Sequence, residues 1–202
     1  MYLTSEPVIL ASASVSRRRM LEAAGIEVHC EPARVDEEEI KLSGKAAGMR
    51  PPEVAEALAD LKASKVARKF THGYVIGGDQ MLECDGRWFD KPVGRAEAAS
   101  HLGLLSGRAH TLYSAVVVFH NGVRVWHHID HATLTMRSFS ETFIDRYLDA
   151  AGDAVLACAG SYQVEGLGAQ LFNKVKGDHF TIQGLPLLPL LDFLRVRRVL
   201  PA

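Results

Sequence analysis

The chain has 202 residues and a mass of 22.1 kDa, with 48% hydrophobic and 23% charged residues. These values predict a single globular domain over residues 1–202 and exclude a largely disordered chain. Lys and Arg number 23 against 24 Asp and Glu, which leaves a net charge of -1. This balance argues against a nucleic-acid coat or a polybasic membrane anchor, so an anionic ligand must be held by a local site.

The cysteines and the N-terminal stretch indicate the cellular compartment in which the protein is expected. The three cysteines lie far apart and form no CxxC pair, which favours a reducing compartment. Residues 1–14 lack the basic region of a signal peptide, and no run of about 18 apolar residues spans a membrane. We therefore expect a soluble, cytoplasmic protein that binds neither membrane nor nucleic acid.

The first half of the chain alternates short apolar runs with helical spacing. A loop is expected over 32–50, because this stretch is polar and carries runs of charge. The other expected elements are a strand over 8–11, a helix over 17–24 ended by Gly25, a strand over 26–30, a helix over 53–70 opened by Pro51 and Pro52, and a strand over 74–76 that ends at Gly77-Gly78-Asp79.

The second half contains two strong hairpin signals, Asp85-Gly86 and Asn121-Gly122. Strands and helices interleave, while the hairpins interrupt a pure βα rhythm, so the expected class is α/β with a mixed sheet. The expected elements are strands over 81–84, 87–89, 110–120 and 123–136, helices over 95–105 and from the Ser140 cap onward, a glycine-rich stretch over 160–168, a strand over 171–175 and a last helix opened by Gly184-Leu185-Pro186.

A serine-rich turn between the first strand and the first helix is the first candidate for chemistry. Ser12, Ser14 and Ser16 precede or flank Arg17 and Arg18. Backbone N–H groups at a helix N-terminus suit a phosphate, and arginines oppose the helix dipole unless an anion lies beside them. The alternative interpretation is a serine N-cap followed by surface arginines.

Asp79 is the second candidate, because it follows an apolar strand in an α/β pattern. Ligands in such folds gather at the carboxyl ends of strands, where a carboxylate can hold a metal or orient a water. The alternative is a turn aspartate that caps backbone amides.

Three further features are weaker. Lys91 and the acidic run Asp36–Glu39 resemble ordinary solvated side chains when taken alone. The histidine-rich segment 127–131 invites a zinc hypothesis, but alternation along a strand separates its side chains onto two faces. A zinc site there is not expected.

Taken together, these segments resemble the Maf family of nucleoside triphosphate pyrophosphatases. The resemblance extends from about Ile9 to Leu191, and the order of the motifs makes it specific. The matching motifs are Leu10-Ala11-Ser12-Ala13-Ser14-x-x-Arg17, Val35-Asp36-Glu37, Leu58-Ala59-x-x-Lys62-Ala63, Gly78-Asp79, Lys91-Pro92, Leu105-Ser106-Gly107-x-x-His110, Glu165-Gly166-x-Gly168 and Gly184-Leu185-Pro186-Leu187.

The resemblance implies a two-lobed Maf/ITPase-like fold with a mixed twisted sheet, flanking helices and a central cleft. It also implies a homodimer and the hydrolysis of a nucleoside triphosphate to monophosphate and pyrophosphate, with a divalent cation such as Mg, Mn or Co. The implied roles are catalysis by Asp79, metal binding by Asp79 and Glu37, and phosphate or substrate binding by Ser12, Ser14, Arg17, Lys62 and Lys91.

Three positions track substrate choice in the resembled family, and here they are Ser16, Gln80 and Glu165. Gln80 and Glu165 resemble the branch that prefers 7-methyl-GTP, whereas Ser16 departs from both branches. A carboxylate suits guanine, because it accepts two adjacent N–H donors. The expected substrate is therefore a modified nucleotide such as 7-methyl-GTP, in a house-cleaning role.

Two alternatives remain open. A nucleotide-binding regulator of septum formation and cell division would need the phosphate turn without a water-activating carboxylate. A broad-specificity enzyme acting on UTP or dTTP would follow if Ser16 leaves an unselective pocket.

Overall fold

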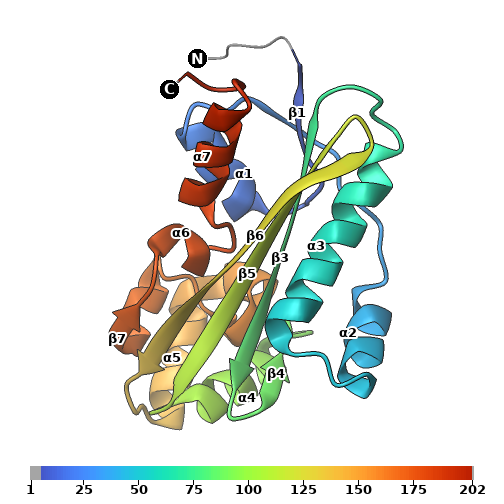
Figure 1. Cartoon of the computed structure of the whole chain (residues 1–202). Helices are drawn as coiled ribbons and strands as arrows, with labels where there is room; N and C mark the ends of the chain where they lie inside the picture. The colour runs from blue at the N-terminus through green and yellow to red at the C-terminus, as the bar shows by residue number, and fades with distance from the viewer. Residues whose placement is uncertain (1–5, 202) are drawn as a thin grey trace. The chain divides into compact units, whose positions relative to one another are not determined.

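A computed structural model describes residues 6–201 of the protein, and its seven strands form one mixed sheet (Figure 1). The predicted α/β class with a mixed sheet is confirmed. The strands are β1 (Val8–Leu10), β2 (Val28–Cys30), β3 (Tyr74–Cys84), β4 (Arg87–Phe89), β5 (Ala109–His120), β6 (Val123–Met136) and β7 (Phe172–Lys176). The hydrogen-bonded strand order is β2-β1-β3-β5-β6-β7, and β4 pairs with β3. The helices are α1 (Val15–Ala23), α2 (Glu37–Ala46), α3 (Pro51–Ala67), α4 (Arg95–Leu105), α5 (Glu141–Ala151), α6 (His179–Ile182) and α7 (Leu187–Val196).

The chain divides into two compact units, consistent with the two lobes of the predicted fold. Unit 1 takes Met1–Gln80, Tyr113–Asp130 and His179–Ala202, and unit 2 takes Met81–Leu112 and His131–Asp178. The central cleft implied by the resemblance stays a prediction.

In unit 1, strands β1, β2 and β3 run parallel, with Leu10 opposite both Cys30 and Ile76. Figure 1 shows α1 and α7 on one side of these strands and α3 on the other. The apolar core on the α1 and α7 side contains side chains from both helices and from alternate positions of β3, namely Tyr74 and Ile76. Successive strand residues point to opposite faces, so the residues between them point toward α3.

Gly77 and Gly78 allow unusually close packing on these two faces of β3. A Cβ at Gly77 would lie 2.2 Å from the Ala59 carbonyl oxygen of α3. A Cβ at Gly78 would lie 3.1 Å from Arg17 Nε on the other face. The two glycines therefore mark close approach of neighbouring groups rather than a turn.

The two predicted hairpins are confirmed. Asp85-Gly86 joins β3 to β4, and Asn121-Gly122 joins β5 to β6. All four residues have positive φ angles, between 51° and 80°, as the tight turns between twisted strands require.

Unit 2 packs α4 and α5 around a buried aromatic cluster. His110 Nε2 and Tyr162 Oη lie 2.7 Å apart, and both rings contact Phe172. On the surface of the same unit, Arg95 of α4 forms ion pairs with Asp145 and Asp149 of α5. Ser140 caps α5 by accepting a hydrogen bond from Phe143 N, as the sequence predicts.

Two sequence predictions are wrong. The stretch 32–50 is not a loop throughout, because α2 occupies Glu37–Ala46. Asp36 caps this helix, and three glutamates in its first turn and Lys45 in its last turn complement the helix dipole. The second error is the strand end at Asp79, since β3 continues to Cys84 as one strand.

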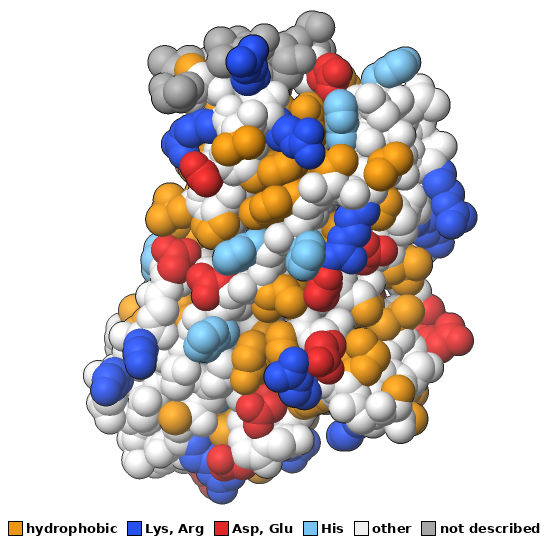
Figure 2. Space-filling model, viewed as in Figure 1, with side chains coloured by type: hydrophobic (Ala, Val, Ile, Leu, Met, Phe, Trp, Pro, Cys, Tyr) orange, Lys and Arg blue, Asp and Glu red, His pale blue; other side chains and the backbone are white. Residues whose placement is uncertain are grey.

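The helices among residues 6–201 include none with the length and apolar character needed to cross a membrane. On the face in Figure 2, acidic and basic side chains are interspersed with hydrophobic ones, as the balanced composition suggests. Residues 1–5, which open the stretch assessed for a signal peptide, lie outside the described residues.

Candidate active site

The serine turn after β1 forms an N-cap and also holds an arginine. Ser14 Oγ accepts a hydrogen bond from Arg17 N, which caps α1. Ser12 Oγ accepts from Ser14 N at 3.2 Å and from Arg17 Nη1 at 3.2 Å. The capping alternative is thus correct for Ser14, yet Arg17 is not a surface arginine, because only 9% of it is exposed.

A backbone carbonyl fixes the other side of the Arg17 guanidinium. Arg17 Nε donates to the Gly184 carbonyl oxygen at 2.7 Å. With Ser12 and Gly184 on two edges, the plane of the guanidinium is set before any ligand arrives. Arg18 points elsewhere, to an exposed ion pair with Glu22.

Lys62 of α3 joins two carboxylates. Its Nζ lies 2.5 Å from Asp79 Oδ1 and 2.7 Å from Glu37 Oε1. Lys62 and Asp79 are 7% and 5% exposed, so both charges are removed from water and depend on each other. Glu37 is the first residue of α2, so the helix missed from the sequence carries one of the two carboxylates.

Asp79 lies inside β3 but just past the end of its neighbour. Strand β1 ends at Leu10, which pairs with Ile76. Asp79 is three residues beyond that pair, where the parallel neighbour has already turned into the serine loop. The carboxyl-end rule therefore applies to β1 rather than to β3.

The charges in this part of unit 1 act on one another. Burial lowers the pKa of the Arg17 guanidinium from its ordinary value, and the negative charges of Asp79 and Glu37 oppose this shift. Unit 1 thus places two cations, Arg17 and Lys62, with two carboxylates. The cations of such a set can bind phosphate oxygens, and a carboxylate can accept a proton from water.

The three positions predicted to select the base differ in exposure and in the unit they belong to. Ser16 is partly exposed in the first turn of α1. Gln80 is partly buried, and its Nε2 donates to Ser114 Oγ and to the carbonyl oxygens of Thr181 and Ile182. Glu165 belongs to unit 2 and is exposed.

Within unit 2, the charges of Lys91 and Glu165 both act on the thiol of Cys158. Burial raises the pKa of this thiol, Glu165 adds to the rise, and Lys91 and a hydrogen bond from Gln163 oppose it. Lys91 is exposed, and the following Pro92 is buried. Of the predicted site residues, the structure brings together Ser12, Ser14, Arg17, Glu37, Lys62 and Asp79 in unit 1.

Comparison with known proteins identifies the relatives of this chain. A family model described as "Maf-like protein" matches residues 7–197. The chain belongs to the Maf family. This member is 55% identical to the "Nucleoside triphosphate pyrophosphatase" of Paramagnetospirillum magneticum over 187 residues, which cover 93% of this chain and 96% of that protein.

Two other relatives extend the comparison. The protein of the same name from Rhodospirillum rubrum is 51% identical, and the match covers 96% of each chain. The "7-methyl-GTP pyrophosphatase" of Rhizobium etli is 46% identical, covering 93% of this Maf chain and 94% of that protein.

Four groups that contact predicted site residues of this Maf protein were not predicted. They are the Gly184 carbonyl on Arg17, and the Ser114 hydroxyl and the Thr181 and Ile182 carbonyls on Gln80. The motif Gly184-Leu185-Pro186, which was predicted only to open the last helix, was a signal for the first of these. A backbone acceptor has no side-chain signature, so the contact itself could not be read from the sequence.

The carboxylates fit a divalent cation of the magnesium type. Mg²⁺ is usually bound through one or two carboxylates, with waters and substrate phosphates as the other ligands. Glu37 and Asp79 supply two carboxylates that converge on one point, at Lys62 Nζ. Residues 6–201 contain no group of three or more His, Cys, Asp and Glu that could hold an ion. The remaining ligands would therefore come from substrate and water.

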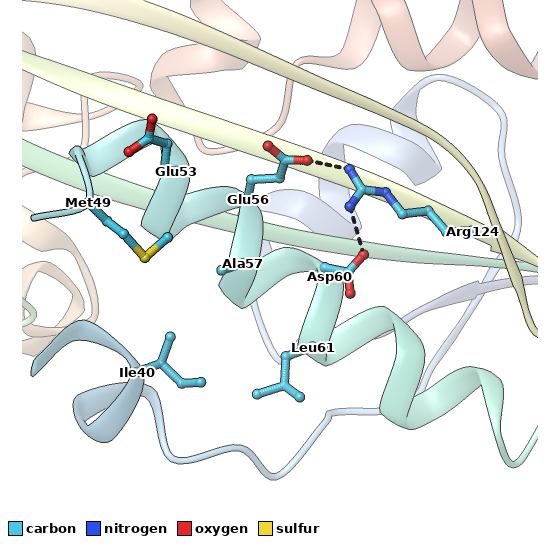
Figure 3. Close-up of a pocket in the computed structure, with 8 residues that line it drawn as sticks. All are labelled: Ile40, Met49, Glu53, Glu56, Ala57, Asp60, Leu61 and Arg124. Atoms are coloured by element: carbon cyan, nitrogen blue, oxygen red, sulfur yellow. Dashed lines mark hydrogen bonds and ion pairs between the residues drawn. The ribbon is translucent and has the colours of Figure 1, made fainter. Parts of the chain in front are cut away.

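A separate groove of about 540 Å³ lies between α2 and α3 (Figure 3). Its floor is apolar, with Ile40 and Leu61 pointing into the space between the helices. Its acidic groups are already paired, since Arg124 bridges Glu56 and Asp60. The charges on its lining are wrong for a triphosphate, so we place the candidate active site at Asp79 rather than in this groove.

Proposed function

We propose that the chain hydrolyses nucleoside triphosphates to the nucleoside monophosphate and pyrophosphate. The observation that carries the proposal is the buried arrangement of Asp79, Lys62 and Glu37 beside Arg17. Relatives about half identical over nearly the whole chain bear the name of this activity, which supports the same conclusion.

The proposed reaction is attack of water on the α-phosphorus. The new P–O bond forms as the bridging bond to the β-phosphate breaks, and pyrophosphate leaves. Asp79 accepts the proton of the attacking water, while Arg17 and Lys62 bind phosphate oxygens. Ser12 and Ser14, which hold the turn and Arg17 in place, are proposed to line the phosphate site. Lys91 of unit 2 is proposed as a further phosphate ligand.

Glu37 and Asp79 are proposed to hold a divalent cation. When bound, the cation would neutralise phosphate charge and polarise the attacked phosphoryl group. Lys62, which contacts both carboxylates, keeps them close together without the ion.

The buried ionic network favours an enzyme over the regulator. A protein that only binds nucleotide needs no group that accepts a proton from water, whereas hydrolysis does, and Asp79 supplies a carboxylate for that role. For the base, Ser16, Gln80 and Glu165 stay predicted specificity positions, with 7-methyl-GTP as the proposed substrate. A relative named for this substrate is 46% identical to the chain.

The homodimer, the cytoplasmic location and the single domain over residues 1–202 stay predictions. The family model supports the last of these, because its match over 7–197 includes residues of both units.

The test is pyrophosphate release by the purified protein with Mg²⁺, Mn²⁺ or Co²⁺. The substrates are 7-methyl-GTP, GTP, UTP, dTTP and CTP. We expect metal-dependent release, highest for 7-methyl-GTP. A preference for UTP or dTTP would refute the base assignment and keep the reaction. Nucleotide binding without release from any substrate would refute the reaction and favour the regulator.

A further inference from the structure

Asp79 and Gln80 are neighbours in β3, but they serve opposite faces of the strand. Gly77 and Asp79 face α3, where a Cβ on Gly77 would meet Ala59 and Asp79 meets Lys62. Gly78 and Gln80 face the other way, and a Cβ on Gly78 would meet Arg17. Gln80 therefore lies on the Arg17 side of the strand, not on the carboxylate side.

The side-chain amide of Gln80 is fully occupied as a donor. Its two hydrogens serve three acceptors, which are Ser114 Oγ at 2.9 Å, Thr181 O at 3.1 Å and Ile182 O at 3.0 Å. A base could use this NH₂ group only by displacing bonds that the protein already makes. The donors of Gln80 thus hold protein backbone in the structure.

A second set of bonds ties the same segment to β5 and β6. Ser114 Oγ donates to Thr181 O at 2.8 Å, and Thr181 Oγ1 donates to Asp130 Oδ2 at 3.0 Å. Ser114 and Thr181 are 0% exposed, so these bonds do not compete with water. Side chains of three strands, β3, β5 and β6, therefore all hydrogen-bond to the same residue, Thr181.

Thr181 is connected to Arg17 through Gly184. The Thr181 carbonyl also accepts a hydrogen bond from Gly184 N at 3.0 Å, which closes a tight turn over residues 181–184. Gly184 has a φ of 98°, a conformation that favours glycine. Its own carbonyl then accepts from Arg17 Nε at 2.7 Å. The turn is a rigid link between Gln80 and the guanidinium.

We infer that Gln80 is a positioning residue for phosphate binding, acting through the 181–184 turn and the Gly184 carbonyl to orient Arg17. Ser114 is a second positioning residue, because it hydrogen-bonds to both Gln80 and the Thr181 carbonyl. The inference rests on the proposed function, because it assigns Arg17 to the substrate's phosphates. It differs from the specificity role predicted for Gln80, since a device that acts on phosphate affects every base equally.

The test compares wild-type protein, Gln80→Leu and Ser114→Ala on 7-methyl-GTP, GTP and UTP. Loss of hydrogen bonds that orient a charged group corresponds to a fall of about tenfold in kcat/KM. We expect this fall to be the same for each substrate and to appear mainly in KM. Ser114→Ala changes a buried side chain by one oxygen, so it reports on the device even if Gln80→Leu folds poorly.

A double-mutant cycle with Arg17→Met separates positioning from a purely structural role. If Gln80 acts through Arg17, Gln80→Leu changes kcat/KM less than about twofold in the Arg17→Met background, because coupled residues are not additive. Gln183→Ala, in the same turn, is the matched control and should behave as wild type. A fall confined to one base, or full additivity with Arg17→Met, would overturn the inference.

Binding of inorganic pyrophosphate, measured by calorimetry, keeps this inference separate from the reaction itself. Gln80→Leu should weaken pyrophosphate binding about tenfold whether or not the wild type turns over any nucleotide. Unchanged pyrophosphate binding would overturn the positioning role. Absence of turnover in the wild type would instead overturn the proposed function.

Discussion

The site residues of unit 1 and those of unit 2 are held in different ways. Arg17, Lys62 and Asp79 are at most 9% exposed, and each is bonded to other protein groups. Lys91 and Glu165 are exposed. A buried charge is retained only with partners, whereas an exposed one is solvated until a ligand displaces its water. The groups proposed to react are thus fixed by the fold, whereas the proposed site residues of unit 2 are exposed to solvent.

The largest effect is expected from Asp79→Asn. Removing the charge that accepts the proton should lower kcat by about a thousandfold or more, since general-base catalysis contributes about 10²–10⁴. Asparagine is isosteric, so nucleotide affinity should stay within about tenfold. Steady-state kinetics and equilibrium nucleotide binding measure the two effects.

Asp60→Asn is the matched control, because Asp60 lies on α3 in an ion pair with Arg124 and away from Lys62. It should leave kcat unchanged. If Asp79→Asn weakened nucleotide binding as much as turnover, Asp79 would act in substrate binding or in folding and not in the chemical step. The contrast between buried reacting groups in unit 1 and exposed binding groups in unit 2 would then be wrong.

The paired variants Gly77→Ala and Gly78→Ala separate folding from phosphate binding within unit 1. The added Cβ at position 77 meets the backbone of α3 at 2.2 Å, so the free energy of unfolding should fall by about 3 kcal/mol. At position 78 it meets the Arg17 side chain at 3.1 Å, so Arg17 must shift by a few tenths of an ångström, but no backbone atom is forced aside. Gly78→Ala should lower the Tm less than Gly77→Ala does and raise KM about tenfold.

Thermal unfolding and KM, measured on both variants, test this contrast. Equal losses of stability would show that the Arg17 face is packed as rigidly as the α3 face. An unchanged KM for Gly78→Ala would show that Arg17 does not bind the substrate.

The sequence predicted the elements of the fold only in part. The Asp85-Gly86 and Asn121-Gly122 hairpins were predictable, because two-residue turns with positive φ have a narrow set of residues. Helix α2 was missed because its polar first turn resembled a solvated acidic run, although Asp36 and Glu39 carried the N-cap signal. The continuation of β3 past Asp79 was missed because glycines usually mark turns, and close approach to α3 is a tertiary effect.

The site was predictable as a set of residue types but not as a set of contacts. Arg17, Lys62 and Asp79 came from motif positions, and the structure pairs Lys62 with Asp79, whose negative charge also acts on Arg17. The hydrogen bonds of Gln80 and Gly184 join segments about one hundred residues or more apart through backbone atoms. Spacing in the sequence carries no information about such contacts.

His110 tests whether unit 2 also contains a fixed polar group. Burial lowers the pKa of His110 from its ordinary 6.5 to about 4. The unfolded chain therefore binds the proton first as pH falls, so the stabilising contribution is complete above pH 6.5 and is lost toward pH 4. The loss amounts to about 3 kcal/mol.

Denaturant unfolding between pH 7 and pH 4 measures this loss. His110→Gln should show a shallower decline in stability than wild type across that range, since glutamine does not titrate. His72→Gln, at an exposed position, should follow the wild-type curve. Parallel curves for wild type and His110→Gln would show that His110 is not held neutral by burial.

The smallest effect is expected from Glu165→Gln. Removing a charge that accepts two N–H donors should lower kcat/KM for 7-methyl-GTP and GTP about tenfold. The values for UTP and dTTP should stay as in wild type. Glu141→Gln, another exposed glutamate of unit 2, is the control. An equal fall for all bases would remove the base-reading role of Glu165 and leave only a general effect of charge.

The identity of the products tests the central claim most directly. Wild-type protein is incubated with a triphosphate and a divalent cation, and the products are separated by anion exchange. Attack on the α-phosphorus predicts nucleoside monophosphate and pyrophosphate in equal amounts, with both formed about a thousandfold more slowly by Asp79→Asn. Nucleoside diphosphate with inorganic phosphate, or equal product from both proteins, would contradict the account.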